Sequence, residues 1–224
     1  MRVLAVDTST MAGGVAVLDG ERVIGESLLD VRTTHSERLM LAVDRALGDA
    51  GWAPASLDGF AVAVGPGSFT GLRIGLAAVK GLAFALGRPI AAVPTLDAMA
   101  AGLPFASQPV CAVLDARRDE VYASLYRWDG RDMRREWDYL ALSPAALAER
   151  LTEPVVGVGD GAALVRSPWL TPARPIRRGP AAAVVGWLGA ERLRRGEHVA
   201  AGDLVPFYLR PSEAELKRRA VAVH

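Results

Sequence analysis

Three aspartates stand where runs of apolar residues end, and their positions suggest a nucleotide site. Asp7 and Asp115 each follow such a run directly, and Asp160 lies between two glycines after a third run. Carboxylates at the ends of strands can position a metal-bound phosphate. We therefore take Asp7, with Thr8 and Ser9 beside it, as candidate nucleotide-binding residues. The alternative is an Asx turn, in which the backbone N–H groups that follow Asp7 satisfy its carboxylate.

A glycine-rich segment, Gly65–Gly71, lies between a predicted strand and a predicted helix. A P-loop has a lysine and a hydroxyl residue directly after its last glycine, but this chain has Leu72 and Arg73 there. Pro66 also breaks the dinucleotide fingerprint and the nucleophile elbow. None of these three common motifs fits the segment.

What remains at this segment is a helix N-terminus that follows a glycine-rich turn. Free backbone N–H groups and the helix dipole attract anions at such a point. The candidate anion-binding residues are Gly67, Ser68 and Thr70. The alternative is that the glycines serve only tight packing of the strand against the helix, with Ser68 or Thr70 as an ordinary N-cap.

The histidines and the cysteine do not form a catalytic or metal-binding constellation. His35, His198 and His224 are far apart in the sequence, and none has a second histidine at helical spacing. Cys111 is the single cysteine, so it has no partner for a disulfide or a thiolate metal site. We therefore expect no metal site and no catalytic residue in this chain, and a reducing, cytoplasmic environment.

The apolar pattern predicts an order of strands and helices that occurs twice. Each half begins with a meander of strands, which a helix, a strand and a second helix follow. The run Val-Leu-Ala-Val-Asp at 3–7 is echoed by Cys-Ala-Val-Leu-Asp at 111–115. We predict an α/β protein of two duplicated lobes, each with a mixed sheet and packed helices, as in actin-like proteins. The predicted lobes are residues 1–102 and 103–224, with the last helix, at about 180–195, in the second.

The first two long helices, at about 34–50 and 70–86, carry more apolar surface than one small lobe can cover. Arg73 and Lys80 are the only charges in the second helix, and a helix that is apolar on all sides must be buried on all sides. We predict that the two helices form a partner surface. Its candidate residues are His35, Leu39, Met40, Val43, Leu47, Leu72, Gly75, Val79 and Leu82. The alternative is that the second lobe covers these helices.

The composition argues against direct binding to nucleic acid or membranes. The chain has 26 basic and 25 acidic residues, and its net charge of +1 gives no electrostatic reason for either. The longest apolar tracts, around 74–93 and 181–190, are interrupted by charges or too short to span a bilayer. We expect a soluble protein.

Several motifs together resemble the TsaB family, also called YeaZ. The resemblance covers nearly the whole chain and is strongest over residues 1–100. It implies an actin-like (ASKHA) fold and a role in making threonylcarbamoyladenosine beside the tRNA anticodon. The motifs that carry it are Asp7-Thr8-Ser9, His35-Ser36-Glu37, the segment Gly65–Gly75, Asp115-Ala-Arg-Arg-Asp-Glu-Val-Tyr122, Gly159-Asp-Gly161 and Pro206-Phe-Tyr-Leu-Arg210.

The resemblance also implies partners. In the TsaB family the transfer is made by a paralogous subunit, TsaD, which holds a metal through a histidine pair, and an ATPase subunit, TsaE, joins the assembly. Family members bind TsaD through the first two helices of the N-terminal lobe and self-associate through the same surface. We therefore expect a non-catalytic subunit that forms a homodimer when TsaD is absent. It would reach tRNA indirectly, and ATP with Mg²⁺ only at the level of the complex.

Two other functions stay open. The chain could be an independent actin-like phosphotransferase that uses Asp7 and the Gly65–Gly71 segment around Mg-ATP. A peptidase label also attaches to the wider family, but no protease site is visible in the sequence.

Overall fold

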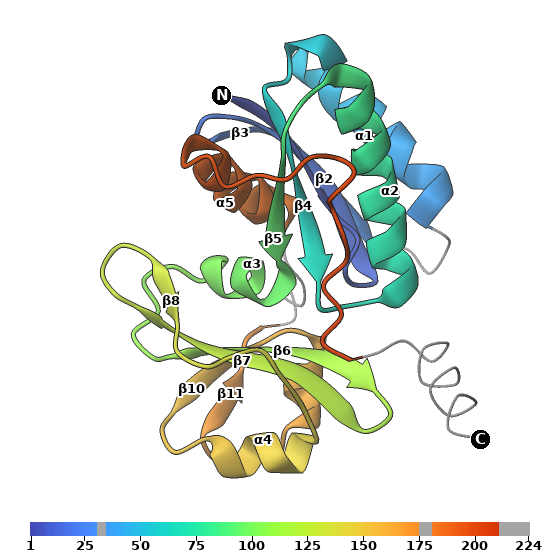
Figure 1. Cartoon of the computed structure of the whole chain (residues 1–224). Coiled ribbons are helices and arrows are strands. Elements are labelled where there is room, and N and C mark those ends of the chain that lie inside the picture. Colours follow the sequence, from blue (N-terminus) through green and yellow to red (C-terminus); the bar gives the residue numbers. More distant parts are fainter. Residues whose placement is uncertain (31–34, 175–180, 211–224) are drawn as a thin grey trace, which may run out of the picture.

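The computed structural model of the chain describes residues 1–30, 35–174 and 181–210, and it shows two lobes, each built on one mixed β-sheet (Figure 1). The strands of the N-terminal sheet lie in the order β3-β2-β1-β4-β5, and those of the C-terminal sheet in the order β11-β10-β6-β7-β8, with β9 paired to β7. The strands are β1 (Arg2–Asp7), β2 (Ala12–Asp19), β3 (Arg22–Asp30), β4 (Gly59–Gly65), β5 (Ile90–Pro94), β6 (Val110–Arg117), β7 (Glu120–Trp128), β8 (Met133–Arg135), β9 (Leu140–Leu142), β10 (Val155–Val158) and β11 (Leu170–Pro172).

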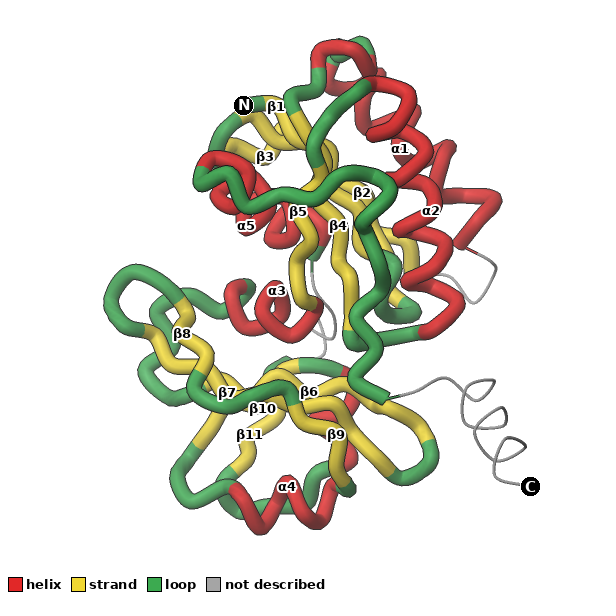
Figure 2. The backbone as a smooth tube through the Cα atoms, viewed as in Figure 1, coloured by secondary structure: helices red, strands yellow, loops and turns green. Residues whose placement is uncertain are grey.

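The helices are placed unevenly between the lobes, because the longer ones all lie against the N-terminal sheet (Figure 2). The α-helices are α1 (His35–Ala50), α2 (Phe69–Leu86), α3 (Thr95–Ala101), α4 (Pro144–Arg150) and α5 (Ala182–Arg194), and two 3₁₀ turns are η1 (Pro54–Ser56) and η2 (Asp160–Leu164).

The predicted duplication is confirmed by the topology of the two sheets. In the first lobe β1 is antiparallel to β2 and parallel to β4, and in the second β6 is antiparallel to β7 and parallel to β10. The equivalent glycines are Gly65, the last residue of β4, and Gly159, directly after β10, with φ of 119° and 114°. An added Cβ would lie 2.4 and 2.0 Å from a neighbouring backbone oxygen at these positions, so both strands end in a turn that only glycine fits.

The N-terminal sheet is covered on both faces. Helices α1 and α2 pack on one face, around Leu4, Val6, Phe60 and Val62, which have no exposed surface. The alternate residues of the same strands, such as Val3 and Ala5, point to the other face and contact α5. Burial on both sides explains why β1 and β4 are continuous apolar runs in the sequence.

The position of α5 corrects the predicted domain boundary. We assigned the last helix to the second lobe, but α5 lies on the N-terminal sheet. Gly186 and Gly189 let its backbone come close to the sheet, because an added Cβ would lie 2.2 Å from the side chain of Leu18 and 2.3 Å from that of Ala61. Residues 103–174 therefore form the C-terminal lobe, and the chain then returns to complete the N-terminal one.

The short helix α3 lies between the lobes. Its Ala98 belongs to the core that α5 shares with the N-terminal sheet, whereas Leu96 and Met99 belong to a core that includes β6, β7 and β10. The opposite face of the C-terminal sheet is covered by α4. Because α3 is buried from both sides, it is part of both lobes.

Helix α2 is the one helix of the described residues that has the length and apolar composition to cross a membrane. Core helices of soluble proteins share both properties. Six of its residues are buried in the N-terminal lobe: Gly71, Leu72, Gly75, Leu76, Val79 and Ala83.

Candidate functional site

Asp7 closes β1, and its carboxylate is held inside the protein. The side chain has no exposed surface, and its Oδ1 accepts hydrogen bonds from the backbone N–H of Ser9 at 2.9 Å and from the Ser9 hydroxyl at 2.6 Å. Its Oδ2 is buried without a hydrogen-bond partner. The alternative of a local turn that satisfies the carboxylate is therefore confirmed for one of the two oxygens.

The environment of Asp7 opposes a negative charge. Burial raises the pKa of Asp7 to about 6, although the two hydrogen bonds from Ser9 lower it. Thr8 and Ser9 are also buried, so neither a metal ion nor a phosphate can contact any of the three without a change of structure. The prediction that Asp7, Thr8 and Ser9 face an open nucleotide site is therefore corrected.

The glycine-rich segment packs directly on this turn. The Ser68 backbone N–H donates to the carbonyl of Ser9 at 2.7 Å, and the Thr8 hydroxyl donates to the carbonyl of Gly71 at 2.7 Å. An added Cβ on Gly67 would lie 2.3 Å from the Ser9 oxygen, and one on Gly71 would lie 2.1 Å from the Thr8 oxygen. The glycines thus allow the close approach of two backbones.

The N-terminus of α2 is capped by its own chain. Ser68 is the N-cap, and its Oγ accepts from the Gly71 backbone N–H at 3.2 Å, while Thr70 is exposed on the first turn. The predicted anion site at Gly67, Ser68 and Thr70 is therefore corrected in favour of the packing interpretation, because the turn at Thr8 and Ser9 fills the space beside the glycines.

The strand-end acids of the C-terminal lobe also serve local structure. Asp115 accepts the backbone N–H of Arg117 at 2.7 Å and pairs with its guanidinium at 3.0 Å. Asp160 accepts the backbone N–H of Asp115 at 3.0 Å, and burial raises the pKa of Asp160. Within the described residues no three His, Cys, Asp or Glu side chains form a group that could hold a metal ion. Asp115 and Asp160 therefore hold the turns at the ends of β6 and β10.

Most of the predicted partner-surface residues lie in the core of the N-terminal lobe instead. Leu39, Val43, Leu47, Leu72 and Val79 are at most 7% exposed, so the prediction that they contact a partner is wrong for these five. These residues lie on the sides of α1 and α2 that face the N-terminal sheet, and they cover its apolar surface.

The other four predicted residues have different positions. An added Cβ on the buried Gly75 would lie 2.2 Å from the Thr8 hydroxyl oxygen, so this glycine serves packing inside the lobe. Leu82 is half-buried against the same core. Met40 is 45% exposed, as the prediction requires. His35 begins α1, but its side chain lies outside the described residues.

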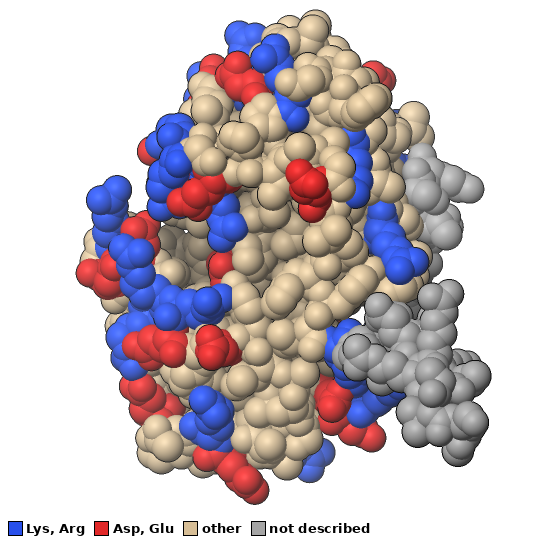
Figure 3. Space-filling model, in the orientation of Figure 1, with Lys and Arg blue, Asp and Glu red and all other residues tan. Residues whose placement is uncertain are grey.

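Both helices nevertheless expose apolar residues on their outward sides. Phe84 is 83% exposed and Leu41 is 58% exposed. We call the exposed apolar residues of the two helices the outer helix surface; in a space-filling view the side of the molecule where α1 and α2 lie is mostly tan, with blue Lys and Arg side chains among the tan (Figure 3). Its members are Met40, Leu41, Ala77, Gly81, Phe84 and Ala85.

Comparison with known proteins identifies the family. The sequence model of the family described as TsaD, tRNA N6-adenosine threonylcarbamoyltransferase, matches residues 30–148. A Bacillus subtilis protein named tRNA threonylcarbamoyladenosine biosynthesis protein TsaB is 34% identical over 97% of this chain and 97% of its own length. The chain belongs to the TsaB (YeaZ) family.

Solved structures agree with this assignment. YeaZ from Pseudomonas aeruginosa superposes with a TM-score of 0.79 at 35% identity, over 93% of this chain and 99% of that protein. An activator of 2-hydroxyisocaproyl-CoA dehydratase from Clostridium difficile shares the fold alone, with a TM-score of 0.50 at 10% identity. The TsaB-family chain therefore has an actin-like ASKHA fold, as its duplicated topology predicts.

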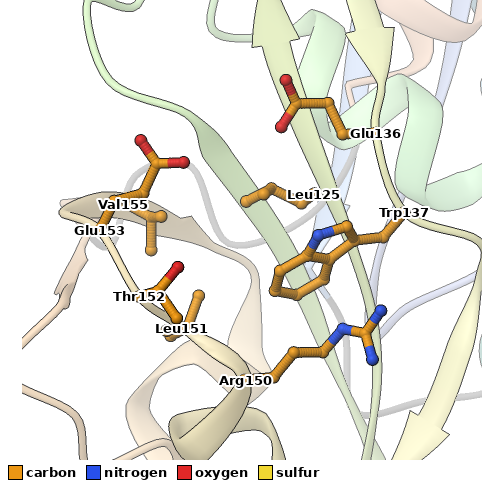
Figure 4. Close-up of a pocket in the computed structure, with 8 residues that line it drawn as sticks. All are labelled: Leu125, Glu136, Trp137, Arg150, Leu151, Thr152, Glu153 and Val155. Atoms are coloured by element: carbon orange, nitrogen blue, oxygen red, sulfur yellow. The ribbon is translucent and has the colours of Figure 1, made fainter.

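A pocket of about 260 Å³ in this TsaB-family chain lies between α4 and the outer face of the C-terminal sheet (Figure 4). Its two glutamates, Glu136 and Glu153, each form an ion pair with Arg127 at 2.7 Å. Arg150 lies over the ring of Trp137 at 4.8 Å. The pocket is smaller than typical ligand sites. Its lining residues are Leu125, Glu136, Trp137, Arg150, Leu151, Thr152, Glu153 and Val155.

The candidate partner residues predicted from the sequence did not include the outward residues of α2, although a signal for them exists. Arg73 and Lys80 are the two charges of the helix, and charges mark the side that faces water. Ala77, Gly81 and Phe84 follow Arg73 at four, eight and eleven positions, which is the spacing of one helix face. If the side of α2 that carries Arg73 and Lys80 is taken as the exposed side, the sequence identifies these residues in place of Leu72 and Val79.

Proposed function

We propose that this TsaB-family chain is a non-catalytic subunit that binds and supports a TsaD-type transferase in threonylcarbamoyladenosine formation on tRNA. The name of the B. subtilis relative supports this pathway. The family model described as TsaD matches residues 30–148, about half of the chain, which supports a paralogous partner of related sequence. Two paralogues with similar N-terminal lobes can pack related helices against each other.

The observation that carries the proposal is the outer helix surface. Most of Phe84 is exposed to solvent, and the opposite side of its helix packs against the N-terminal sheet. Exposed apolar residues at this density on two neighbouring helices are typical of a surface that another protein covers.

Gly81 leaves open space on the outer side of α2. It lies in the middle of α2, and an added Cβ there would meet nothing within 4 Å. A mid-helix glycine destabilises a helix by roughly 0.5–1 kcal/mol relative to alanine, and no contact with the described residues requires this one. With the exposed Ala77 and Ala85 one turn away on each side, it leaves room for a partner helix to approach closely.

The accessory role is supported by the burial of Asp7, at the position where the sequence suggested a nucleotide site. Asp7 is sealed from solvent by the chain itself, and its environment opposes the charge that a metal-bound phosphate requires. In the proposed assembly the chemistry belongs to the TsaD-type partner. We further propose that a TsaE-type ATPase joins this cytoplasmic assembly, and that the chain forms a homodimer through the outer helix surface when the transferase is absent.

A matched set of charge substitutions tests the docking surface. Phe84→Glu places a charge on the outer helix surface, and we expect it to abolish co-purification with the cognate TsaD-type protein and the tRNA modification that depends on it. Leu164→Glu is the control, because Leu164 is also an exposed apolar residue, at 47%, but lies in the C-terminal lobe. Equal binding of TsaD by both variants would refute the proposed surface.

Val79→Glu separates docking from folding. Val79 has no exposed surface, so a charge there has neither water nor a partner, and we expect the N-terminal lobe itself to unfold. Circular dichroism should report lost structure for this variant and native structure for Phe84→Glu. The sequence had instead placed Val79 among the residues of α2 that contact a partner.

Calorimetry on the isolated protein addresses the phosphotransferase alternative. We expect no heat of binding for Mg-ATP and no turnover, since Asp7 cannot be reached. Saturable binding with hydrolysis would support an independent enzyme and contradict the accessory role.

A further inference from the structure

Two described segments cross between the lobes, and both make polar contacts on each side. One is α3, and the other is residues 204–210, which we call the strap. In Figure 1 the strap is the red segment that runs along the N-terminal sheet beside α2 and descends to the C-terminal lobe. Leu204 anchors its start, because it is buried in the core under α1 and α2.

The first crossing centres on Asp97 of α3. Its Oδ1 accepts hydrogen bonds from the hydroxyls of Tyr126 at 2.8 Å and Tyr139 at 2.7 Å, and both tyrosines belong to the C-terminal lobe. Its Oδ2 faces the guanidinium of Arg192 at 3.7 Å, and Arg192 also donates to the carbonyl of Ala92 at 2.6 Å. One carboxylate therefore joins the C-terminal sheet to α5 and β5 of the N-terminal lobe.

Tyr126 and Tyr139 keep their hydroxyl protons and remain hydrogen-bond donors to Asp97. Burial, and after it the negative charge of Asp97, raise the pKa of both Tyr126 and Tyr139 above its ordinary value. Their hydroxyls stay protonated at any physiological pH, so the two bonds to Asp97 persist.

The strap makes the second crossing. On the N-terminal lobe the Phe207 backbone N–H donates to the carbonyl of Val64 at 2.7 Å, and the Tyr208 hydroxyl accepts from Nε of Arg73 at 3.0 Å. On the C-terminal lobe Arg210 forms an ion pair with Glu120 and donates to the carbonyl of Ala116 at 3.3 Å. The strap thus ties the end of β4 and the start of α2 to the β6–β7 hairpin.

Tyr139 links the two crossings. Its hydroxyl bonds Asp97, its ring packs on the ring of Phe207 with centroids 5.3 Å apart, and Arg135 lies over the same ring at 4.2 Å. A movement of the lobes about α3 would therefore have to break the contacts of the strap as well.

We propose that α3 and the strap form a lock that holds the two lobes at one fixed angle, with Tyr139 as its central residue. Hinge motion in two-lobed proteins needs a few residues that absorb the change while little else crosses between the lobes. Here a shared buried helix, a carboxylate bonded from both lobes and a terminal segment clamped at both ends cross between them. The lock makes the outer helix surface and the C-terminal lobe one rigid body.

Distance measurements between spin labels test the lock in the full-length chain. Asp49→Cys on α1 and Glu149→Cys on α4 place labels on exposed positions in different lobes. Cys111 will not take a label, because it is buried and burial raises the pKa of its thiol to about 12. For this otherwise unchanged protein we expect a single narrow distance distribution that does not shift when Mg-ATP is added.

Releasing the lock should change that distribution. Tyr139→Phe combined with Glu120→Gln removes one contact from each crossing while it keeps side-chain size, and we expect the distribution to broaden and to gain longer distances. Arg134→Ala, which removes an ion pair to Asp129 within the C-terminal lobe, is the control and should leave it unchanged.

Either of two results would overturn the lock. One is a distance distribution that is broad, or that shifts with Mg-ATP, in the labelled protein whose lock residues are unchanged. This measurement does not depend on the folding of a lock variant. The other is a natively folded double variant whose distribution matches that of the control.

Discussion

At the scale of single residues, the burial of Asp7 at the end of β1 depends on a segment that is distant in the chain. An aspartate after an apolar run predicts the end of a buried strand, and β1 does end there. Whether such a carboxylate faces a cleft or the interior depends on the segment that packs over it. Here that segment is Gly65–Gly71, which lies far away in the chain, so no local pattern around Asp7 could report its burial.

The buried Asp7 predicts a specific dependence of stability on pH. Its pKa is raised from 3.8 to about 6 in the folded state, which corresponds to about 3 kcal/mol. Below pH 3.8 Asp7 is protonated in both the folded and the unfolded state, so its raised pKa does not lower the free energy of unfolding. As the pH rises towards 6 the unfolded state loses its proton first, so the contribution of Asp7 to the free energy of unfolding falls, and above pH 6 the full penalty applies.

Asp7→Asn should remove this dependence. We expect the difference in unfolding free energy between variant and parent to grow in favour of the variant from pH 4 to pH 7. Urea denaturation at several pH values, followed by circular dichroism, measures it. Parallel pH profiles for the two proteins would show that Asp7 is not buried in the way the structure describes.

At the scale of elements, the limits of α2 were predictable and its orientation was not. The predicted helix at about 70–86 agrees with Phe69–Leu86, because Ser68 caps its start and Gly87 ends it with φ of 63°. Its near-uniform apolar composition leaves only Arg73 and Lys80 to indicate a face, and the predicted partner residues therefore included buried ones.

Two glycines of α2 provide a matched test of its orientation. Gly71→Ala places a Cβ 2.1 Å from the backbone oxygen of Thr8, and we expect a loss of about 1–3 kcal/mol, as for an overpacked core. Gly81→Ala meets nothing within 4 Å and should stabilise the isolated protein by up to about 1 kcal/mol. Thermal or urea unfolding measures both, and changes of the same sign would contradict the packing of α2.

At the scale of the whole molecule, the duplication was predictable and the return of α5 was not. The repeated order of strands and the echo of residues 3–7 in 111–115 contain the information for two similar sheets. Nothing in the sequence of α5 says which sheet it covers. Its Gly186 and Gly189 indicate close packing, but the partners at Leu18 and Ala61 are known only from the assembled fold.

The N-terminal lobe should therefore fail to fold as residues 1–102 alone. This fragment would expose the sheet face at Val3, Ala5 and Ala61 that α5 covers, and we expect it to aggregate. Joining residues 182–210 to it through a flexible linker should restore a soluble, cooperatively unfolding lobe, because both α5 and the strap are then present. A soluble monomeric 1–102 fragment on gel filtration would contradict the role of α5.

The late position of α5 also has a consequence for how the protein is made. The ribosome completes the N-terminal sheet long before it adds the helix that shields one side of it. During that interval the nascent chain carries an uncovered apolar sheet, which is the kind of surface that holdase chaperones retain. A message that ends before the codons of α5 would therefore yield an N-terminal lobe with one sheet face uncovered, even though it encodes every strand of both sheets.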